Sequence, residues 1–198
     1  KPSSSTGYKI ITQWLSSHNR RPFGFQQQTW EQILSGNSGI VNAPTGMGKT
    51  YAVFLGALVR YIHTHPRNYL MKKNNGLQLI WISPLRALAK DIARAMEEVI
   101  AELGMPWQVG IRNGDTPAQE RARQKKQMPE VLIITPESLH LLLAQKDYPN
   151  LFTKLSIIAV DEWHELLGSK RGVQVELALS RLVRMKKKSV VMSHESLV

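Results

Sequence analysis

The sequence contains no cysteine, and this absence excludes several classes of site at once. A disulfide scaffold, a thiolate zinc site and a cysteine nucleophile all require that residue. The six histidines are scattered along the chain and do not take the spacing of metal ligands. Any metal ion is therefore expected to be bound together with another ligand.

Acidic residues and long apolar runs are also scarce. There are 15 Asp and Glu against 26 Lys and Arg, which gives a formal net charge of +11. Such an excess favours a polyanionic partner, with nucleic acid first and an anionic membrane surface second. No apolar run approaches the roughly 20 residues of a membrane span, and the Ser-rich start lacks the apolar core of a signal peptide. We expect a cytoplasmic protein with no membrane partner.

What the sequence does contain is a regular alternation of two patterns. Short apolar β-rich runs are separated by stretches with helical periodicity, and 198 residues suit one well-packed domain. This alternation predicts an α/β fold with a mostly parallel central sheet flanked by helices on both faces. The expected strands are 39–43, 77–83, 107–111, 131–135 and 155–161, the expected helices include 50–61, 85–103 and 173–183, and 67–76 is expected to be an exposed loop.

The first candidate site is the segment 43–50, which reads Ala-Pro-Thr-Gly-Met-Gly-Lys-Thr between an expected strand and an expected helix. That context is the one a phosphate-binding loop of the Walker A type requires. Ala43 replaces the first glycine of the general motif, and this variant resembles the form found in superfamily 2 helicases. Backbone N–H groups and Lys49 would bind ATP phosphates, and the Thr50 hydroxyl would bind Mg²⁺. The predicted nucleotide-binding residues here are Thr45, Gly46, Met47, Gly48, Lys49 and Thr50.

The second candidate site is the acidic segment Asp161-Glu162-Trp163-His164, which follows the apolar run 157–160. Two carboxylates at the end of a buried strand are costly unless they have a use. Asp161 is predicted to hold the Mg²⁺ of the nucleotide, and Glu162 to orient and deprotonate the attacking water. The alternative is an Asp that caps the next helix with a Glu in its first turn. His164 completes an Asp-Glu-x-His pattern, and its resemblance to proteins with this pattern implies that it helps to link the nucleotide state to the second motor domain and to nucleic acid.

Segments 83–88 and 135–139 follow two further strands and resemble helicase motifs Ia and Ib. Arg86 and Thr135 are the residues predicted to contact nucleic-acid phosphates. Each segment could equally be an ordinary helix start with an early proline. Residues 113–116, Asn-Gly-Asp-Thr, resemble the Gly-Asp-Thr segment between those motifs, or form a tight turn.

Two groups of basic residues are further candidates for nucleic-acid contact. Lys170 and Arg171 follow the acidic segment in a stretch that resembles large helicase-related proteins, and we predict that both contact nucleic acid. The basic cluster formed by Arg121, Arg123, Lys125 and Lys126 is either a contact surface or a solvated helix face. Contacts of this kind would give salt-dependent binding that tolerates many sequences.

A glutamine-rich segment precedes the phosphate loop by the interval at which helicases of this class keep a Q motif. Gln26 is predicted to bind the adenine edge, because its amide offers both a donor and an acceptor. Gln27 or Gln28 could read the base instead. Phe23 or Tyr8 could stack on the base, although such aromatic residues often belong to the core.

Together these motifs resemble the first RecA-like domain of superfamily 2 helicases. The residues in and around the motifs are similar to those of the bacterial DNA ligase-associated DExH-box helicases, relatives of the large helicase-related proteins. The resemblance implies ATP and Mg²⁺ as cofactors and movement 3′ to 5′ along single-stranded or partly duplex DNA. It also implies DNA repair, a second RecA-like domain as partner and an association with a DNA ligase complex. Residues 1–36 would form the Q-motif region and residues 37–198 the RecA-like domain.

The sequence departs from this family after the lysines 186–188. The family has a strand followed by a Ser-Ala-Thr motif, whereas residues 189–196 read Ser-Val-Val-Met-Ser-His-Glu-Ser, and we find no motif III. The second RecA-like domain, with its arginine finger, is not in the sequence either. We expect these 198 residues alone to bind nucleotide weakly and to hydrolyse it poorly. An RNA helicase domain, or a nucleic-acid-binding module with an idle nucleotide site, remains an alternative.

Overall fold

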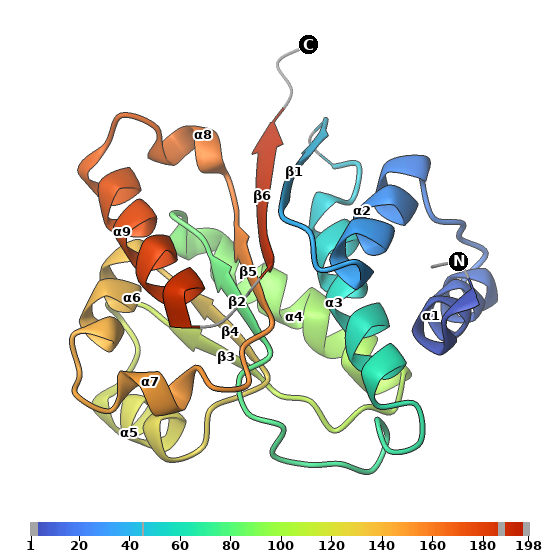
Figure 1. The fold of residues 1–198 in the computed structure, drawn as a ribbon, viewed down its shortest axis with the longest axis horizontal. Helices are drawn as coiled ribbons and strands as arrows, with labels where there is room; N and C mark the ends of the chain where they lie inside the picture. The colour runs from blue at the N-terminus through green and yellow to red at the C-terminus, as the bar shows by residue number, and fades with distance from the viewer. Residues whose placement is uncertain (1–3, 45, 186–188, 196–198) are drawn as a thin grey trace.

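A central parallel sheet organises the molecule, for which a computed structural model describes residues 4–44, 46–185 and 189–195 (Figure 1). The six strands lie in the order β1-β6-β5-β2-β4-β3, and every neighbouring pair is parallel. This confirms the predicted fold class. The strands are β1 Gly39–Ala43, β2 Leu79–Ile82, β3 Val109–Arg112, β4 Val131–Ile134, β5 Ile157–Val160 and β6 Ser189–Glu195.

Helices cover both faces of the sheet, and the sheet separates the core into two apolar layers (Figure 1). One face carries α1 Thr6–Ser17, α2 Gly24–Leu34, α3 Lys49–Thr64 and α4 Ala89–Glu102. The other carries α5 Ala118–Lys126, α6 Pro136–Leu143, α7 Tyr148–Leu151, α8 Trp163–Leu166 and α9 Lys170–Met185. None of the described helices is long and apolar enough to cross a membrane.

The central strands explain why the sequence forms a parallel sheet. All four residues of each of β2, β4 and β5 are buried, so each strand reads as a continuous apolar run rather than an alternating one. Side chains point alternately to the two layers: Leu79 and Trp81 belong to the layer under α3 and α4, and Ile80 and Ile82 to the layer under α6 and α9.

Strand ends and one whole strand differ from the sequence-based expectation. The runs 77–83, 107–111 and 155–161 are trimmed or shifted, because their outer residues lie in the loops that leave the sheet. The expected helix 85–103 begins with a short 3₁₀ turn, Arg86–Leu88. Strand β6 was not predicted; it lies between β1 and β5 and pairs with both. Its pairing depends on two strands remote in sequence.

The first two helices share the core of the sheet domain. A Cβ atom on Gly7 would lie 2.0 Å from the backbone oxygen of Val59, so α1 approaches α3 closely because this residue is glycine. At Gly56, also in α3, a Cβ atom would meet the Ile33 side chain of α2 at 2.6 Å. The boundary near residue 36 stays a prediction, although α1 and α2 belong to the same apolar layer as α3.

Glu130, immediately before β4 at the amino end of the sheet, is the centre of a buried polar network. It is 3% exposed and accepts hydrogen bonds from the backbone N–H groups of Asn75 and Gln108, each at 2.9 Å. Asn75 in turn accepts a hydrogen bond from the Tyr61 hydroxyl. The expected loop 67–76 is therefore exposed for most of its length but fixed at Asn75, which is 5% exposed.

Candidate nucleotide and nucleic-acid site

Five of the predicted functional segments follow strands of the sheet at its carboxyl edge. Because the strands are parallel, the segments that begin after β1, β2, β3, β4 and β5 emerge on the same side of the sheet. The phosphate loop after β1 and the acidic segment after β5 are separated by β6 alone. The motif-like segments after β2, β4 and β3 occupy the other half of that edge.

The phosphate loop has the backbone conformation that its glycines allow. Gly46 and Gly48 have φ values of 79° and 83°, in the left-handed region that other residues rarely adopt. Gly48 is the residue before the first turn of α3, so the loop leads directly into the amino terminus of a 16-residue helix. Exposed backbone N–H groups and a helix amino terminus suit an anion such as a phosphate chain. Thr45, which was predicted to bind nucleotide, lies outside the described residues.

Lys49 and Thr50 begin α3, and both are half-buried. The Lys49 Nζ atom donates a 2.9 Å hydrogen bond to the backbone oxygen of Ala43, so its ammonium group lies across the base of the loop. Met47 at the tip is 39% exposed. A cationic group, a helix-terminal hydroxyl and left-handed glycines on one short loop form a donor set that fits the phosphates of a nucleotide with Mg²⁺.

Hydrogen bonds hold Asp161 at the end of β5. Its backbone N–H donates to Ile82 at 2.8 Å, its Oδ2 accepts from the Trp81 indole N–H at 3.3 Å, and its Oδ1 accepts from the N–H of Glu162 at 3.1 Å. The residue is 7% exposed. These bonds orient a buried carboxylate whose oxygens suit a hard cation such as Mg²⁺. The role of Trp81 was missed, although a buried indole N–H in a central strand usually has a partner.

Glu162 has a strained backbone at the point where β5 turns into α8. Its φ of 47° is left-handed, which is uncommon for a residue other than glycine. Its carboxylate lies 3.5 Å from His164 Nδ1, and His164 Nε2 lies 3.5 Å from Glu165. The residue before α8 is Glu162, and its side chain makes no capping hydrogen bond, so the helix-capping alternative does not describe this junction.

Gln26 connects the glutamine-rich segment to the phosphate loop. It is 6% exposed; its Oε1 accepts from the backbone N–H of Phe23 at 3.0 Å, and its Nε2 donates to the backbone oxygen of Gly48 at 3.1 Å. An amide has a second N–H and a second lone pair, so these bonds leave capacity for a base edge. Among the three glutamines, Gln26 makes the side-chain bond to the phosphate loop, whereas Gln28 lines a cavity of about 300 Å³ between α2 and β1.

The two aromatic candidates for stacking on a base have different surroundings. Tyr8 packs edge-on against Trp30, with ring centroids 5.5 Å apart, and burial together with the nearby charge of Glu31 raises the pKa of its hydroxyl. Phe23 is 50% exposed and stacks on Phe25. Tyr8 therefore contributes to the core, while Phe23 keeps a face accessible near the amino terminus of α2.

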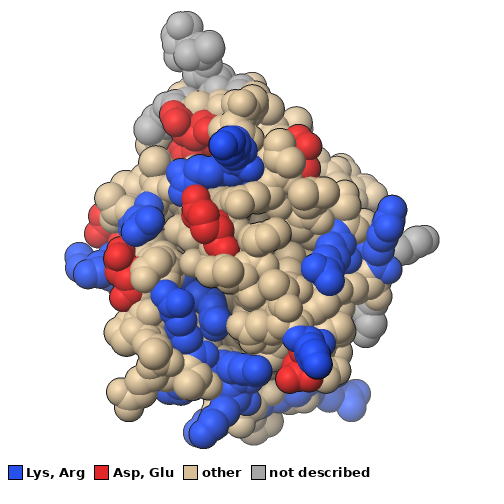
Figure 2. Space-filling view, turned by 90° about the vertical axis from the view of Figure 1, so that its left-hand side faces the viewer, with Lys and Arg blue, Asp and Glu red and all other residues tan. Residues whose placement is uncertain are grey.

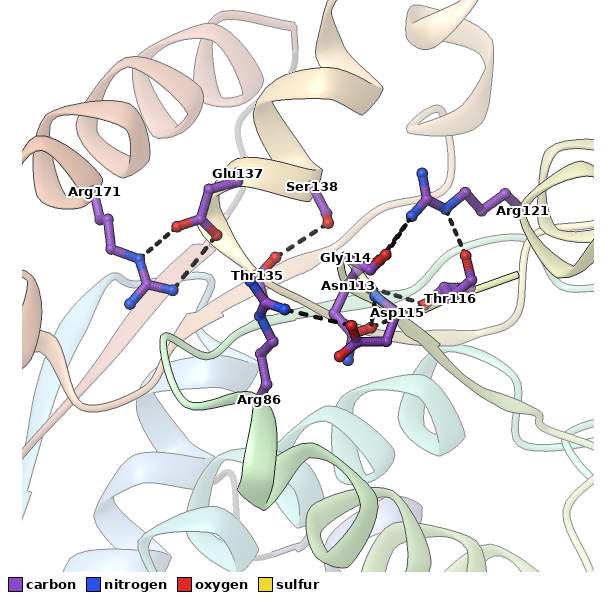
Figure 3. A network of polar contacts seen from close by, with 10 residues as sticks. All are labelled: Arg86, Asn113, Gly114, Asp115, Thr116, Arg121, Thr135, Glu137, Ser138 and Arg171. Carbon is purple, nitrogen blue, oxygen red and sulfur yellow. Dashed lines mark hydrogen bonds and ion pairs between the residues drawn. The ribbon is translucent and has the colours of Figure 1, made fainter. Parts of the chain in front are cut away.

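The second half of the carboxyl edge is a network of contacts between the segments after β2 and β3 (Figure 3). Arg86, 55% exposed, lies 3.5 Å from a carboxylate oxygen of Asp115. A Cβ atom on Gly114 would lie 3.2 Å from the Arg86 guanidinium, so the glycine allows the close approach. Residues 113–116 form a turn in which the Asn113 side chain accepts from the N–H of Asp115. The tight turn expected as the alternative for residues 113–116 is thus present, and their resemblance to the Gly-Asp-Thr segment stays a prediction.

The basic cluster on α5 makes contacts within the protein. Arg121 donates to the backbone oxygens of Thr116, Asn113 and Gly114 at 2.9 to 3.1 Å and so holds the turn in shape. Arg123 pairs with Glu120, and Lys125 lies 3.9 Å from Asp147. These contacts favour the interpretation of the cluster as a solvated helix face.

Thr135 and Lys170 lie at the starts of two helices on the same face of the sheet. Thr135 is 4% exposed, and its hydroxyl contacts the Ser138 hydroxyl at 3.1 Å in the first turn of α6. Lys170 is exposed and begins α9. Their predicted contacts with nucleic-acid phosphates stay predictions. Backbone N–H groups at the amino terminus of α6 are the donors that such a contact would use.

Arg171 is engaged by groups of the protein itself (Figure 3). Its Nε lies 2.6 Å from Glu137 Oε1, and its Nη2 donates to the backbone oxygen of Pro84 at 3.0 Å. Partial burial by itself raises the pKa of Glu137, but hydrogen bonds and the charge of Arg171 bring that pKa below its ordinary value. The predicted contact of Arg171 with nucleic acid stays a prediction.

Arg112 is a further cation at this edge that sequence reasoning missed. It ends β3 directly before the turn 113–116 and is 7% exposed. Burial, followed by the nearby charge of Arg121, lowers the pKa of its guanidinium. An arginine at the end of an apolar strand run is the signal that could have identified it. Positive charge therefore lies beneath this half of the edge as well as on its surface.

Basic side chains are also spread over the surface of the molecule. On the face that carries α9, Lys and Arg predominate over Asp and Glu and are dispersed among neutral residues (Figure 2). The excess of positive charge is thus not confined to one segment. A distributed charge of this kind favours salt-dependent association with polyanions.

Sequence comparisons identify the family. The model of the DEAD/DEAH box helicase family matches residues 23–193. A protein of Escherichia coli, "Lhr helicase/uracil glycosylase", is 36% identical over 180 residues, which are 85% of this chain and 12% of the relative. An "ATP-dependent helicase Lhr-Core" of Methanothermobacter thermautotrophicus is 33% identical over 188 residues, 88% of this chain and 22% of the relative. The chain thus spans less than a quarter of these relatives.

A comparison with solved structures supports the same assignment. The helicase Lhr of Mycobacterium smegmatis, in a structure bound to ssDNA and AMP-PNP, matches all of this chain and 26% of its own with a TM-score of 0.82 at 29% identity. This likeness confirms the RecA-like helicase fold predicted from the motifs. The chain belongs to the DEAD/DEAH box helicase family.

Proposed function

We propose that this chain is the nucleotide-binding motor domain of an ATP-dependent DNA helicase or translocase. The observation that carries the proposal is the placement of the glycine loop with Lys49 and the acidic segment with Asp161 and Glu162 at one sheet edge, separated by a single strand. Related proteins named ATP-dependent helicases, and a similar structure bound to ssDNA and AMP-PNP, support it.

In this proposal the nucleotide half of the edge binds and hydrolyses ATP. The loop N–H groups and Lys49 bind the phosphates, Gln26 reads the adenine, and Thr50 and Asp161 would hold Mg²⁺, which supplies charge neutralisation on the phosphates. Glu162 accepts the proton of the attacking water, and His164 lies against its carboxylate. A second RecA-like domain would supply the arginine finger.

The other half of the edge grips single-stranded or partly duplex DNA. Arg86, Thr135 and Lys170 contact successive phosphates, so binding is strongly salt-dependent and insensitive to base sequence. Within the same proposal the full-length protein moves 3′ to 5′ in the cytoplasm and acts in DNA repair, in association with a DNA ligase. The resemblance to ligase-associated DExH-box helicases is the support for that context.

The most direct test of the nucleotide site is Lys49→Ala in the full-length protein, with Lys9→Ala on the exposed face of α1 as the matched control. Binding of a fluorescent ATP analogue with Mg²⁺ is measured by titration. We expect Lys49→Ala to weaken binding at least about tenfold, because a charge-assisted phosphate contact is lost, and Lys9→Ala to leave it unchanged. Equal affinities of all three proteins would support a nucleic-acid-binding module with an idle nucleotide site.

The choice between DNA and RNA is tested separately. Matched DNA and RNA strands compete for the full-length protein, and we expect the DNA strand to displace the RNA strand at lower concentration. The shared motifs contact a sugar-phosphate backbone, so discrimination depends on the 2′-hydroxyl. Preferential binding of RNA would establish the RNA helicase alternative and contradict the DNA assignment.

A further inference from the structure

Arg171 makes contacts that connect three segments of the carboxyl edge. From the first turn of α9, its Nε and Nη2 reach the two carboxylate oxygens of Glu137 at 2.6 and 3.5 Å, and Nη2 also donates to the backbone oxygen of Pro84 at 3.0 Å. The guanidinium therefore bridges α9, the start of α6 and the loop after β2; Figure 3 shows its contact with Glu137. A planar fork with several donors is suited to such a bridge, and a lysine is not.

Both partners of Arg171 adjoin residues proposed to contact phosphates. Glu137 lies two residues after Thr135, and Pro84 lies two residues before Arg86. One side chain thus holds both phosphate-contact segments in position relative to α9. Its own exposure is moderate, with 38% of the side chain accessible.

The other end of this connection is the acidic segment. Ser169 donates its hydroxyl to the backbone oxygen of Leu166 at 2.7 Å and accepts the N–H of Gly172 at 3.0 Å. A Cβ atom on Gly172 would lie 2.1 Å from that same Leu166 oxygen, so α8 and α9 are in close contact. Glu162 directly precedes α8 and His164 lies in it, so these close contacts connect both residues to the start of α9, where Arg171 lies.

We propose that Arg171 is a positioning residue that couples the nucleotide at the acidic segment to the grip of the Thr135 and Arg86 segments on nucleic acid. The proposal rests on the proposed function and deepens it. When the acidic segment shifts with the nucleotide, Arg171 shifts Glu137 and Pro84 together, and both phosphate-contact segments change at once. Coupling between two sites is reciprocal, so nucleic acid also changes nucleotide affinity by the same factor.

Two other roles for Arg171 give different results. A direct phosphate contact would make Arg171→Gln weaken DNA binding equally with and without nucleotide, and Glu137→Gln would not weaken it. If the ion pair only stabilised the fold, both substitutions would lower the free energy of unfolding and leave the nucleotide dependence of DNA binding intact. The coupling role predicts that both substitutions reduce that dependence.

The experiment measures the dissociation constant of a labelled single-stranded DNA for the full-length protein, with and without Mg²⁺ and AMP-PNP. In the wild type we expect the two constants to differ by about 5- to 150-fold. Arg171→Gln and Glu137→Gln should each reduce that ratio by about two- to thirtyfold. Arg123→Gln is the matched control, because Arg123 makes the same kind of ion pair with Glu120 on α5, and its ratio should equal that of the wild type.

A second measurement keeps the test independent of folding. The exchanged pair, Arg171→Glu with Glu137→Arg, should recover part of the ratio lost in either single charge reversal, since the ion pair is restored. Unchanged ratios in Arg171→Gln and Glu137→Gln would overturn the coupling role while leaving the motor assignment in place. A wild-type protein without affinity for single-stranded DNA would overturn both.

Discussion

The two halves of the carboxyl edge are built differently. In the half after β1 and β5, the backbone conformation sets the shape of the site. Gly46, Gly48 and Glu162 adopt left-handed conformations, and Asp161 is buried. In the half after β2, β3 and β4, ion pairs between distant segments predominate, as in Arg86 with Asp115 and Arg171 with Glu137 (Figure 3). In the proposed function, the first half would bind one nucleotide, and the second would hold several loops along an extended nucleic-acid strand.

If the two halves of the edge act separately, the largest effect of a single substitution is expected at Glu162, on ATP turnover. Glu162→Gln in the full-length protein removes the group proposed to accept the proton of water and should lower ATP turnover about 10²- to 10⁴-fold. Affinity for single-stranded DNA should change little, because the substitution lies in the other half. Steady-state hydrolysis and DNA titrations measure the two effects. Glu98→Gln, at an exposed position on α4, is the matched control. A parallel loss of DNA affinity would contradict the assignment of ATP hydrolysis and DNA binding to separate halves of the edge.

An intermediate effect is predicted at Arg86. Arg86→Gln should weaken single-stranded DNA binding about two- to tenfold and reduce the slope of log affinity against log salt by about 0.7, because the phosphate contact proposed for Arg86 would be lost. Nucleotide binding should be unchanged. Arg94→Gln, an exposed position on α4, is the control. An unaltered salt slope would show that Arg86 serves Asp115 and the turn rather than a phosphate.

The smallest effect concerns pH and the pair formed by Arg171 and Glu137. The pKa of Glu137 is lower in the folded protein than its ordinary value of 4.5. The stabilisation is therefore present above about pH 4.5 and is lost as the pH falls through the lowered value. Arg171→Gln should cost at most about 1 kcal/mol at pH 7, since the pair is partly exposed. Urea denaturation at pH 7 and near pH 3 should show that difference shrinking in acid; a constant difference would contradict it.

Motifs within one contiguous segment could be read from the sequence. The glycine loop places Lys49 and Thr50 in the first turn of α3, and the run before Asp161 forms a central buried strand, because in both cases neighbouring residues determine the local conformation. The parallel α/β class followed from alternating apolar runs for the same reason. The structure shows where these residues lie, and their chemical roles remain predictions.

Contacts between remote segments could not be read in this way. The bond from Trp81 to Asp161 spans 80 residues, and that from Arg171 to Pro84 spans 87. Strand β6 was missed because its pairing with β1 and β5 depends on the assembled sheet. For Arg171, the resemblance of the stretch after the acidic segment predicted a contact with nucleic acid, and it gave no sign of the contacts that the guanidinium makes with a carboxylate and a carbonyl of the protein.

We propose that one edge of the sheet both hydrolyses ATP and binds DNA. The most direct test is the rate of ATP hydrolysis by the full-length protein as a function of single-stranded DNA concentration. A saturable rise in the rate, absent in Lys49→Ala, is the predicted result. A rate that is independent of DNA at every concentration, or one that survives Lys49→Ala, would contradict the claim.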